Sequence, residues 1–89
     1  MTRVTFSTSF RRAKRKRIDV DRTTEERFWE AVQVFMHDPF DPRLRTHKLS
    51  GKLEGLWSFS VEFDVRVIFY FTEKDEAVFV DVGSHDEVY

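Results

Sequence analysis

A chain of 89 residues has the length of one small domain, and residues 1–89 are expected to form a single folding unit. Hydrophobic residues make up 40% of the chain and aromatic residues 16%, a composition that can fill a core and excludes an intrinsically disordered protein. The lack of cysteine excludes disulfides, thiolate zinc sites and cysteine nucleophiles, and no apolar run approaches the ~20 residues of a membrane span. Because the first ten residues also lack the apolar stretch of a secretory signal, we expect a cytoplasmic protein that does not enter a membrane.

Charge is unevenly distributed along the chain, although the formal net charge is only −1. Residues 1–54 hold 13 Lys and Arg against 8 Asp and Glu, whereas residues 55–89 hold 2 and 8. This asymmetry predicts a basic face that can bind a polyanion.

The N-terminal segment predicts a strand followed by a basic helix. Residues Arg3–Phe6 alternate polar and apolar side chains, and the Ser and Thr residues at 7–9 can cap a helix over Phe10–Arg17. The basic side chains of this helix either form a solvated face or bind RNA phosphates. The candidates for phosphate binding are Arg11, Arg12, Lys14 and Arg15.

A second helix is predicted from a capping box and an apolar stripe. Thr23 and Glu26 have the spacing of the box, and apolar side chains recur at helical spacing up to Met36. Asp38 precedes a proline and therefore ends the helix. The stripe is assigned to the core and comprises Phe28, Trp29, Val32, Phe35 and Met36.

The C-terminal half predicts strands. After a connector over residues 40–52, polar and apolar residues alternate in Trp57–Phe63 and Val65–Phe71, and a third strand covers Ala77–Val82. Consecutive strands joined by tight turns form an antiparallel meander. The expected fold class is α+β: an antiparallel sheet of about four strands, including the N-terminal one, with two N-terminal helices packed on one face.

Strand pairing predicts which distant residues meet. A turn near Lys74 places Arg66 opposite residues 82–84, and a turn at 63–64 begins the strand of Arg66 at the same end. Asp64, Arg66 and His85 should therefore gather at one edge of the sheet.

The residues available for chemistry fit acid–base catalysis on a phosphate. The chain has no Gly-rich phosphate loop and no clustered histidines, so no metal or other cofactor is expected. Histidine suits both proton transfers of metal-independent RNA cleavage, and arginine suits the charge that develops on the phosphate. The candidates are His47, Lys48, Lys52, Arg66, His85 and Tyr89.

Three segments resemble the RelE/ParE superfamily of toxins, in its YafQ/YoeB-like branch of mRNA interferases. His47–Ser58 resembles the "x-L-x-G-x-L-x-G-x-W-S" segment, Asp64–Phe69 resembles the "D-x-R-V-I-F/Y" strand, and Gly83–Tyr89 resembles the "G-x-H-x-x-V-Y" ending. The three occur in family order at the right spacing. The resemblance implies a toxin of a type II toxin–antitoxin module that cleaves mRNA in the A site of the 30S ribosomal subunit without metal. It also implies a cognate antitoxin that holds the toxin inactive in a hetero-oligomeric complex.

The resemblance implies a role for each matching residue. His47 stands at the position of a general base, and Asp64 at an acidic position that some relatives use near the reaction. Arg66 matches an arginine that contacts the scissile phosphate, His85 matches the general acid, and Tyr89 matches a terminal aromatic residue that positions a base.

Each of these residues also has a plain structural interpretation. His47 can be an exposed connector residue, Asp64 and His85 can be turn residues, and Tyr89 can pack on the sheet. Arg66 can pair with an acidic side chain on a neighbouring pleat, an interaction worth ~0–1 kcal/mol at the surface.

Two other functions stay open at this point. A toxin of the ParE kind inhibits DNA gyrase by binding, and a degenerate member only binds its antitoxin. The acidic C-terminal third and Ser60, where several relatives carry a cation, separate the chain from the ribosome-dependent members.

Overall fold

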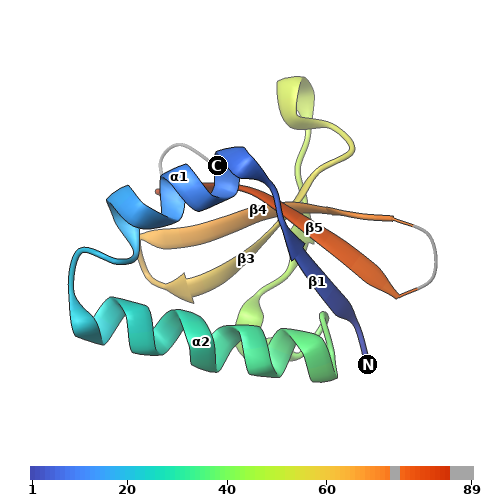
Figure 1. The fold of residues 1–89 in the computed structure, drawn as a ribbon. Coiled ribbons are helices and arrows are strands. Elements are labelled where there is room, and N and C mark those ends of the chain that lie inside the picture. Colours follow the sequence, from blue (N-terminus) through green and yellow to red (C-terminus); the bar gives the residue numbers. More distant parts are fainter. Residues whose placement is uncertain (73–74, 85–89) are drawn as a thin grey trace.

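The computed structural model describes residues 1–72 and 75–84. Two helices and five strands follow one another as shown in Figure 1, with two short 3-10 helices, η1 and η2, in the connector. In chain order these are β1 (Arg3–Phe6), α1 (Thr8–Arg17), α2 (Arg22–His37), η1 (Pro42–Leu44), β2 (His47–Lys48), η2 (Gly51–Leu53), β3 (Trp57–Glu62), β4 (Val65–Phe71) and β5 (Glu76–Gly83). In the described part of the chain, neither helix has the length and apolarity to cross a membrane.

The sheet has the order β1-β5-β4-β3-β2. The β3–β4–β5 meander is antiparallel, as predicted. The prediction of about four antiparallel strands is wrong in two details. β1 runs parallel to β5, and β2 adds a short strand inside the predicted connector. Because the whole of α1 to β4 separates β1 from β5, no hairpin forces those two strands to be antiparallel.

Side-chain caps start both helices. Ser7 caps α1 by accepting a hydrogen bond of 3.0 Å from the backbone N–H of Phe10, as expected for a serine there. The predicted start of α2 at Thr23 is wrong, because Asp21 is the N-cap and accepts from the N–H of Thr24 at 2.8 Å. Aspartate and threonine are both good N-cap residues, and the helix begins two residues earlier than predicted because Asp21 takes this role.

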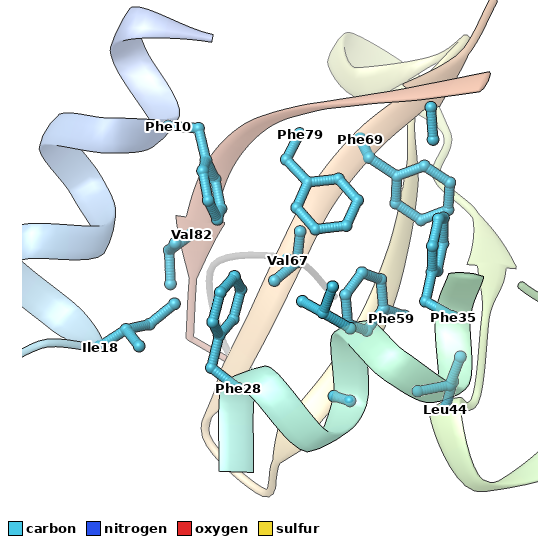
Figure 2. Close-up of a cluster of buried hydrophobic side chains, with 13 residues drawn as sticks. Phe10, Ile18, Phe28, Phe35, Leu44, Phe59, Val67, Phe69, Phe79 and Val82 are labelled. Atoms are coloured by element: carbon cyan, nitrogen blue, oxygen red, sulfur yellow. The ribbon is translucent and has the colours of Figure 1, made fainter. Parts of the chain in front are cut away.

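Phenylalanine rings fill the space between one face of the sheet and the helices (Figure 2). Phe35 of α2 lies 5.0 Å from Phe69 and 5.3 Å from Phe79, measured between ring centroids, and all three are fully buried. Phe10 brings α1 into the same cluster. Trp29 differs from the prediction: its side chain is 43% exposed, because it lies at the border of the helical stripe.

α1 runs along β5 beyond the point where β1 ends (Figure 1). The Ser9 hydroxyl donates to the carbonyl of Val80 at 2.7 Å, and the Arg17 guanidinium donates to that of Val82 at 3.3 Å. Side chains of α1 therefore donate hydrogen bonds to carbonyls of β5 in the stretch where, within the described sheet, β1 no longer lies beside it.

The sheet face opposite the main core is called the outer face below. It carries a second, smaller apolar cluster, in which Leu49 and Ile68 are buried beneath the segment around η2. Gly51 and Gly55 have φ of +64° and +92°, so this segment turns where other residues would be strained.

Candidate active site

Arg66 lies in the middle of three paired strands. It is paired with Ser60 of β3 and with Gly83 of β5, so the prediction that it lies opposite residues 82–84 is confirmed. Its neighbours Val65 and Val67 contribute to the main core, so strand alternation turns Arg66 to the outer face. The residue is only 3% exposed, and an ionised group buried to this degree is rare unless a structural or functional interaction retains it.

His47 lies on the same face. It is paired with Ser58 of β3, which is two residues from Ser60, the partner of Arg66. Paired residues and alternate residues of a strand share a face, so the imidazole and the guanidinium are on one side of the sheet. They are offset by two residues along the strand direction, and β3 lies between their strands.

The contacts of His47 determine its tautomer. Nδ1 lies 3.0 Å from the backbone carbonyl of Arg45, and Nε2 lies 3.5 Å from the hydroxyl of Ser58. Because a carbonyl oxygen can only accept, Nδ1 carries the hydrogen. In the neutral ring Nε2 then holds the lone pair that a general base uses.

The other predicted catalytic residues divide into two groups. Asp64 is exposed in the turn between β3 and β4, at the same end of the sheet as Arg66 and Gly83. His85 and Tyr89 lie outside the described residues. The meeting of Arg66 and His85 therefore stays a prediction, which the position of Gly83 opposite Arg66 supports.

A cavity of 420 Å³ lies between α1 and the outer face. Of the predicted phosphate-binding residues only Arg12 lines it, and Lys16 and Arg17 join it there. Neither Lys16 nor Arg17 was among the phosphate-binding residues predicted from the sequence. The signal was present, because Arg12 and Lys16 are four positions apart and therefore share a helix face.

The remaining basic candidates lie elsewhere. Lys14 forms an ion pair of 2.8 Å with Asp19, and its ammonium lies 5.1 Å from the ring centroid of Trp29. Arg11, Lys14 and Arg15 line a separate depression of 240 Å³. Lys48 lies over the ring of Trp57 at 5.5 Å, and Lys52 is exposed in η2. The structure therefore does not bring these side chains into the cavity of Arg12.

Metal ligands do not cluster in residues 1–72 and 75–84, where no group of three or more His, Asp or Glu side chains comes together. The outer face instead offers a buried guanidinium, an imidazole of defined tautomer and a cavity lined with cations. Such groups can bind a phosphodiester and move protons around it.

Comparison with solved structures places this fold among bacterial toxins. YafQ from E. coli strain BL21(DE3) is 18% identical, with a TM-score of 0.72 over 100% of this chain and 99% of that chain. A YoeB/ParE toxin from Agrobacterium tumefaciens is 14% identical, with a TM-score of 0.77 over 94% of this chain and 99% of that one. The E. coli DinJ-YafQ complex aligns at 18% identity and a TM-score of 0.65, covering 100% of this chain and 99% of that chain. At these identities the likeness concerns the fold alone.

Two sequence comparisons complete the assignment. No curated protein sequence matches the chain significantly. The family model of YafQ, described as a bacterial toxin of type II toxin–antitoxin systems, matches residues 2–89. With this match over almost the whole length, the chain belongs to the YafQ family of toxins of type II toxin–antitoxin systems.

Proposed function

We propose that the protein is an endoribonuclease that cleaves mRNA on the ribosome without a catalytic metal. The 2′-oxygen of the nucleotide before the cut attacks phosphorus, and the bond to the 5′-oxygen of the next nucleotide breaks. The products are a 2′,3′-cyclic phosphate and a free 5′-hydroxyl. One proton leaves the 2′-hydroxyl and another goes to the 5′-oxygen, so the step needs a base and an acid.

The residues of the outer face fit these roles. His47, or Asp64 at the end of the sheet, takes the 2′-hydroxyl proton. Arg66 stabilises the charge on the phosphate, and the exposed Lys52 of η2 adds positive charge on the outer-face side. Lys48 lies over Trp57 on the other face of β2, so it would help only from around the edge of the sheet. In this proposal His85 donates the second proton and Tyr89 positions a base.

A single observation carries the proposal. Arg66 is buried on the outer face, and His47 faces the same side of the sheet from β2, with β3 between the two residues. Nδ1 of His47 lies against the carbonyl of Arg45, which leaves Nε2 as the proton acceptor. A buried cation and a proton acceptor on one face of a sheet can stabilise a developing negative charge and accept a proton, respectively.

The test is primer extension on a defined mRNA, with purified protein and with ribosomes present or absent. We expect cuts in the A-site codon only when ribosomes are present. His47→Ala and His85→Ala should each slow cleavage by ~10²–10⁴-fold. His37→Ala is the matched control, because His37 is exposed at the end of α2 and should leave the rate unchanged.

Failure of the wild-type protein to cut mRNA in this assay would refute the endonuclease. A fall in DNA supercoiling before translation stops, measured in the same cells after induction, would point instead to a gyrase inhibitor.

We also propose that the protein binds a cognate antitoxin at β1 and α2. A second cavity, of 380 Å³, lies between these elements, and β1 is an edge strand of the described sheet. Trp29, which is 43% exposed, lines this cavity together with Arg11. The apolar lining consists of Val4, Phe6, Trp29, Val32 and Met36. Arg11 also lines the adjoining depression with Lys14 and Arg15, so the fitting occupant is an amphipathic, acidic antitoxin segment.

Calorimetric titration with the antitoxin encoded next to this chain tests the second proposal. Trp29→Ala should weaken binding at least ten-fold, since exposed tryptophans that enter a partner's core dominate binding energy. Phe40→Ala, which removes a ring that is 54% exposed on the connector, should not. Equal affinities of the two variants would exclude this surface.

A further inference from the structure

A β-bulge aims Asp81 at the cavity between α1 and the outer face. In the β4–β5 ladder Ile68 is paired with Asp81, but the next residue, Phe69, is paired with Phe79. Val80 is therefore the extra residue. It packs into the outer-face cluster while Asp81 lines the cavity, so two consecutive residues serve the same side of the sheet. Bulges commonly redirect a side chain next to a functional site.

The carboxylate of Asp81 is held in a defined orientation. Its Oδ1 accepts a hydrogen bond of 2.8 Å from the backbone N–H of Val82, and the residue is exposed. Asp81 could be exposed to solvent on a regular strand as well. The effect of the bulge is therefore on the side of the sheet that the carboxylate faces, and not on its exposure.

The lining that α1 contributes to the cavity is cationic. Arg12 and Lys16 project from the same face of α1, and neither has an ion-pair partner among residues 1–72 and 75–84. Apolar side chains also line the cavity: Ala13 of α1, Leu53 of η2 and Ile68 of β4. A volume of 420 Å³ lies within the ~300–1,000 Å³ typical of small-molecule sites.

These three features fit the three parts of a nucleotide. The cations attract a phosphate, and the apolar part of the lining accepts the flat face of a base. The carboxylate would repel the phosphate, so its use is to accept hydrogen bonds from the edge of the base. Cytosine, adenine and guanine each present an exocyclic amino group, whereas uracil presents carbonyl oxygens on both sides of its N3–H.

We propose that this cavity is a nucleotide subsite next to the scissile phosphate, and that Asp81 selects there for a base with an exocyclic amino group. The inference rests on the proposed endoribonuclease, because Gly83 joins the cavity to Arg66. Arg12 and Lys16 hold the flanking phosphate and contribute no base preference.

Nuclear magnetic resonance titration with cytidine and uridine 3′-monophosphates tests the subsite without any cleavage. The two bases differ at the 4-position by an amino group against a carbonyl. The amide of Gly83 and the methyl groups of Ile68 should shift on binding, with cytidine monophosphate about ten-fold tighter than uridine monophosphate. Asp81→Asn should abolish this difference, since an amide can donate as well as accept. Lys16→Gln should weaken both nucleotides alike.

The matched control is Asp75→Asn, which removes the same charge at the other end of β5 and should keep the cytidine preference. If neither nucleotide shifts Gly83 or Ile68, or if Asp81→Asn keeps the preference, the subsite assignment is wrong. Primer extension with ribosomes then separates the two proposals: wild-type cleavage without nucleotide binding at the cavity overturns the subsite alone. Absence of cleavage overturns the endoribonuclease, whatever the titration shows.

Discussion

At the scale of single residues, backbone geometry determines the chemistry that a side chain can perform. The carbonyl of Arg45, whose φ is 52°, receives Nδ1–H of His47. Arg66 depends on strand pairing in a similar way, because Ser60 and Gly83 on its two sides leave it flanked by small residues. The surrounding backbone therefore defines the tautomer of His47 and the neighbours of Arg66 in the absence of substrate.

The tautomer of His47 can be measured directly. With Nδ1–H donated to a carbonyl, the neutral ring should have Nε2 as its unprotonated nitrogen. Nitrogen-15 shifts of the imidazole report which nitrogen lacks hydrogen. His37, exposed on α2, should show the usual mixture. A protonated Nε2 in neutral His47 would contradict its use as a base in this conformation.

Arg66→Lys should slow mRNA cleavage by about 10²-fold or more while keeping the charge. A lysine lacks the planar fork that contacts two phosphate oxygens at once. The comparison is with Arg45→Lys, which conserves charge at an exposed position, and cleavage by primer extension is the measurement. Circular dichroism at the same temperature identifies loss of folding, and a folded Arg66→Lys with full activity would remove Arg66 from the mechanism.

At the scale of elements, α1 has two surfaces with different tasks. Phe10 packs into the main core, while Ser9 and Arg17 donate to carbonyls of β5. The face that carries Arg12 and Lys16 borders the cavity. A charged helix of ten residues is marginal by itself, so its tertiary contacts and its cap keep it formed.

Ser7→Ala should lower the free energy of unfolding by about 1 kcal/mol, because it leaves the N–H of Phe10 without its cap. Urea denaturation at neutral pH measures the change. Thr8→Ala, one position later on the exposed side of the first turn, is the control and should change stability much less. Equal losses for the two variants would mean that the cap is energetically irrelevant.

Asp21 should make the stability depend on pH in the acid range. The backbone N–H of Thr24 and, next, its hydroxyl donate to the carboxylate and hold its pKa below the ordinary 3.8. A lowered pKa in the folded state means that the stabilisation is present above about pH 4 and is lost as the pH falls further. Asp21→Asn keeps a neutral cap, so its urea midpoint should decline less between pH 5 and pH 2. An identical decline would show that the carboxylate contributes nothing.

At the scale of the whole molecule, an aromatic core holds together elements that are distant in sequence. Phe79 of β5 lies within 5.6 Å of Phe6, Phe10, Phe35 and Phe59, measured between ring centroids. These rings come from β1, α1, α2 and β3. The outer face, with Arg66 and the cavity, is built on the reverse side of the same strands, so the core determines how accurately the site is placed.

Phe79→Ala should therefore cost about 3–5 kcal/mol, a large part of the ~5–15 kcal/mol that stabilises a typical domain. Thermal unfolding followed by circular dichroism should show a fall in Tm of more than ten degrees or an unfolded protein. Phe63→Ala, in the β3–β4 turn with its ring 79% exposed, should lose much less. Similar Tm values for the two variants would contradict the central position of Phe79.

Local features of the sequence determined the elements and one important pairing. Hydrophobic periodicity located both helices and the meander, because side-chain period depends only on the backbone type. Tight turns between consecutive strands predicted Arg66 opposite residues 82–84, and the structure pairs it with Gly83, since a hairpin leaves little freedom of register. The family likeness also came from short local segments.

The tertiary structure alone decided the direction of β1, the short strand at His47 and the cavity between α1 and β5. These features depend on which distant surfaces pack together. The free energy of that packing is distributed over the many phenylalanine rings of the core, so no single segment of the sequence reveals it. The bulge at Val80 is of the same kind: one extra residue in β5 is invisible in the alternation of the strand, yet it turns Asp81 toward the cavity.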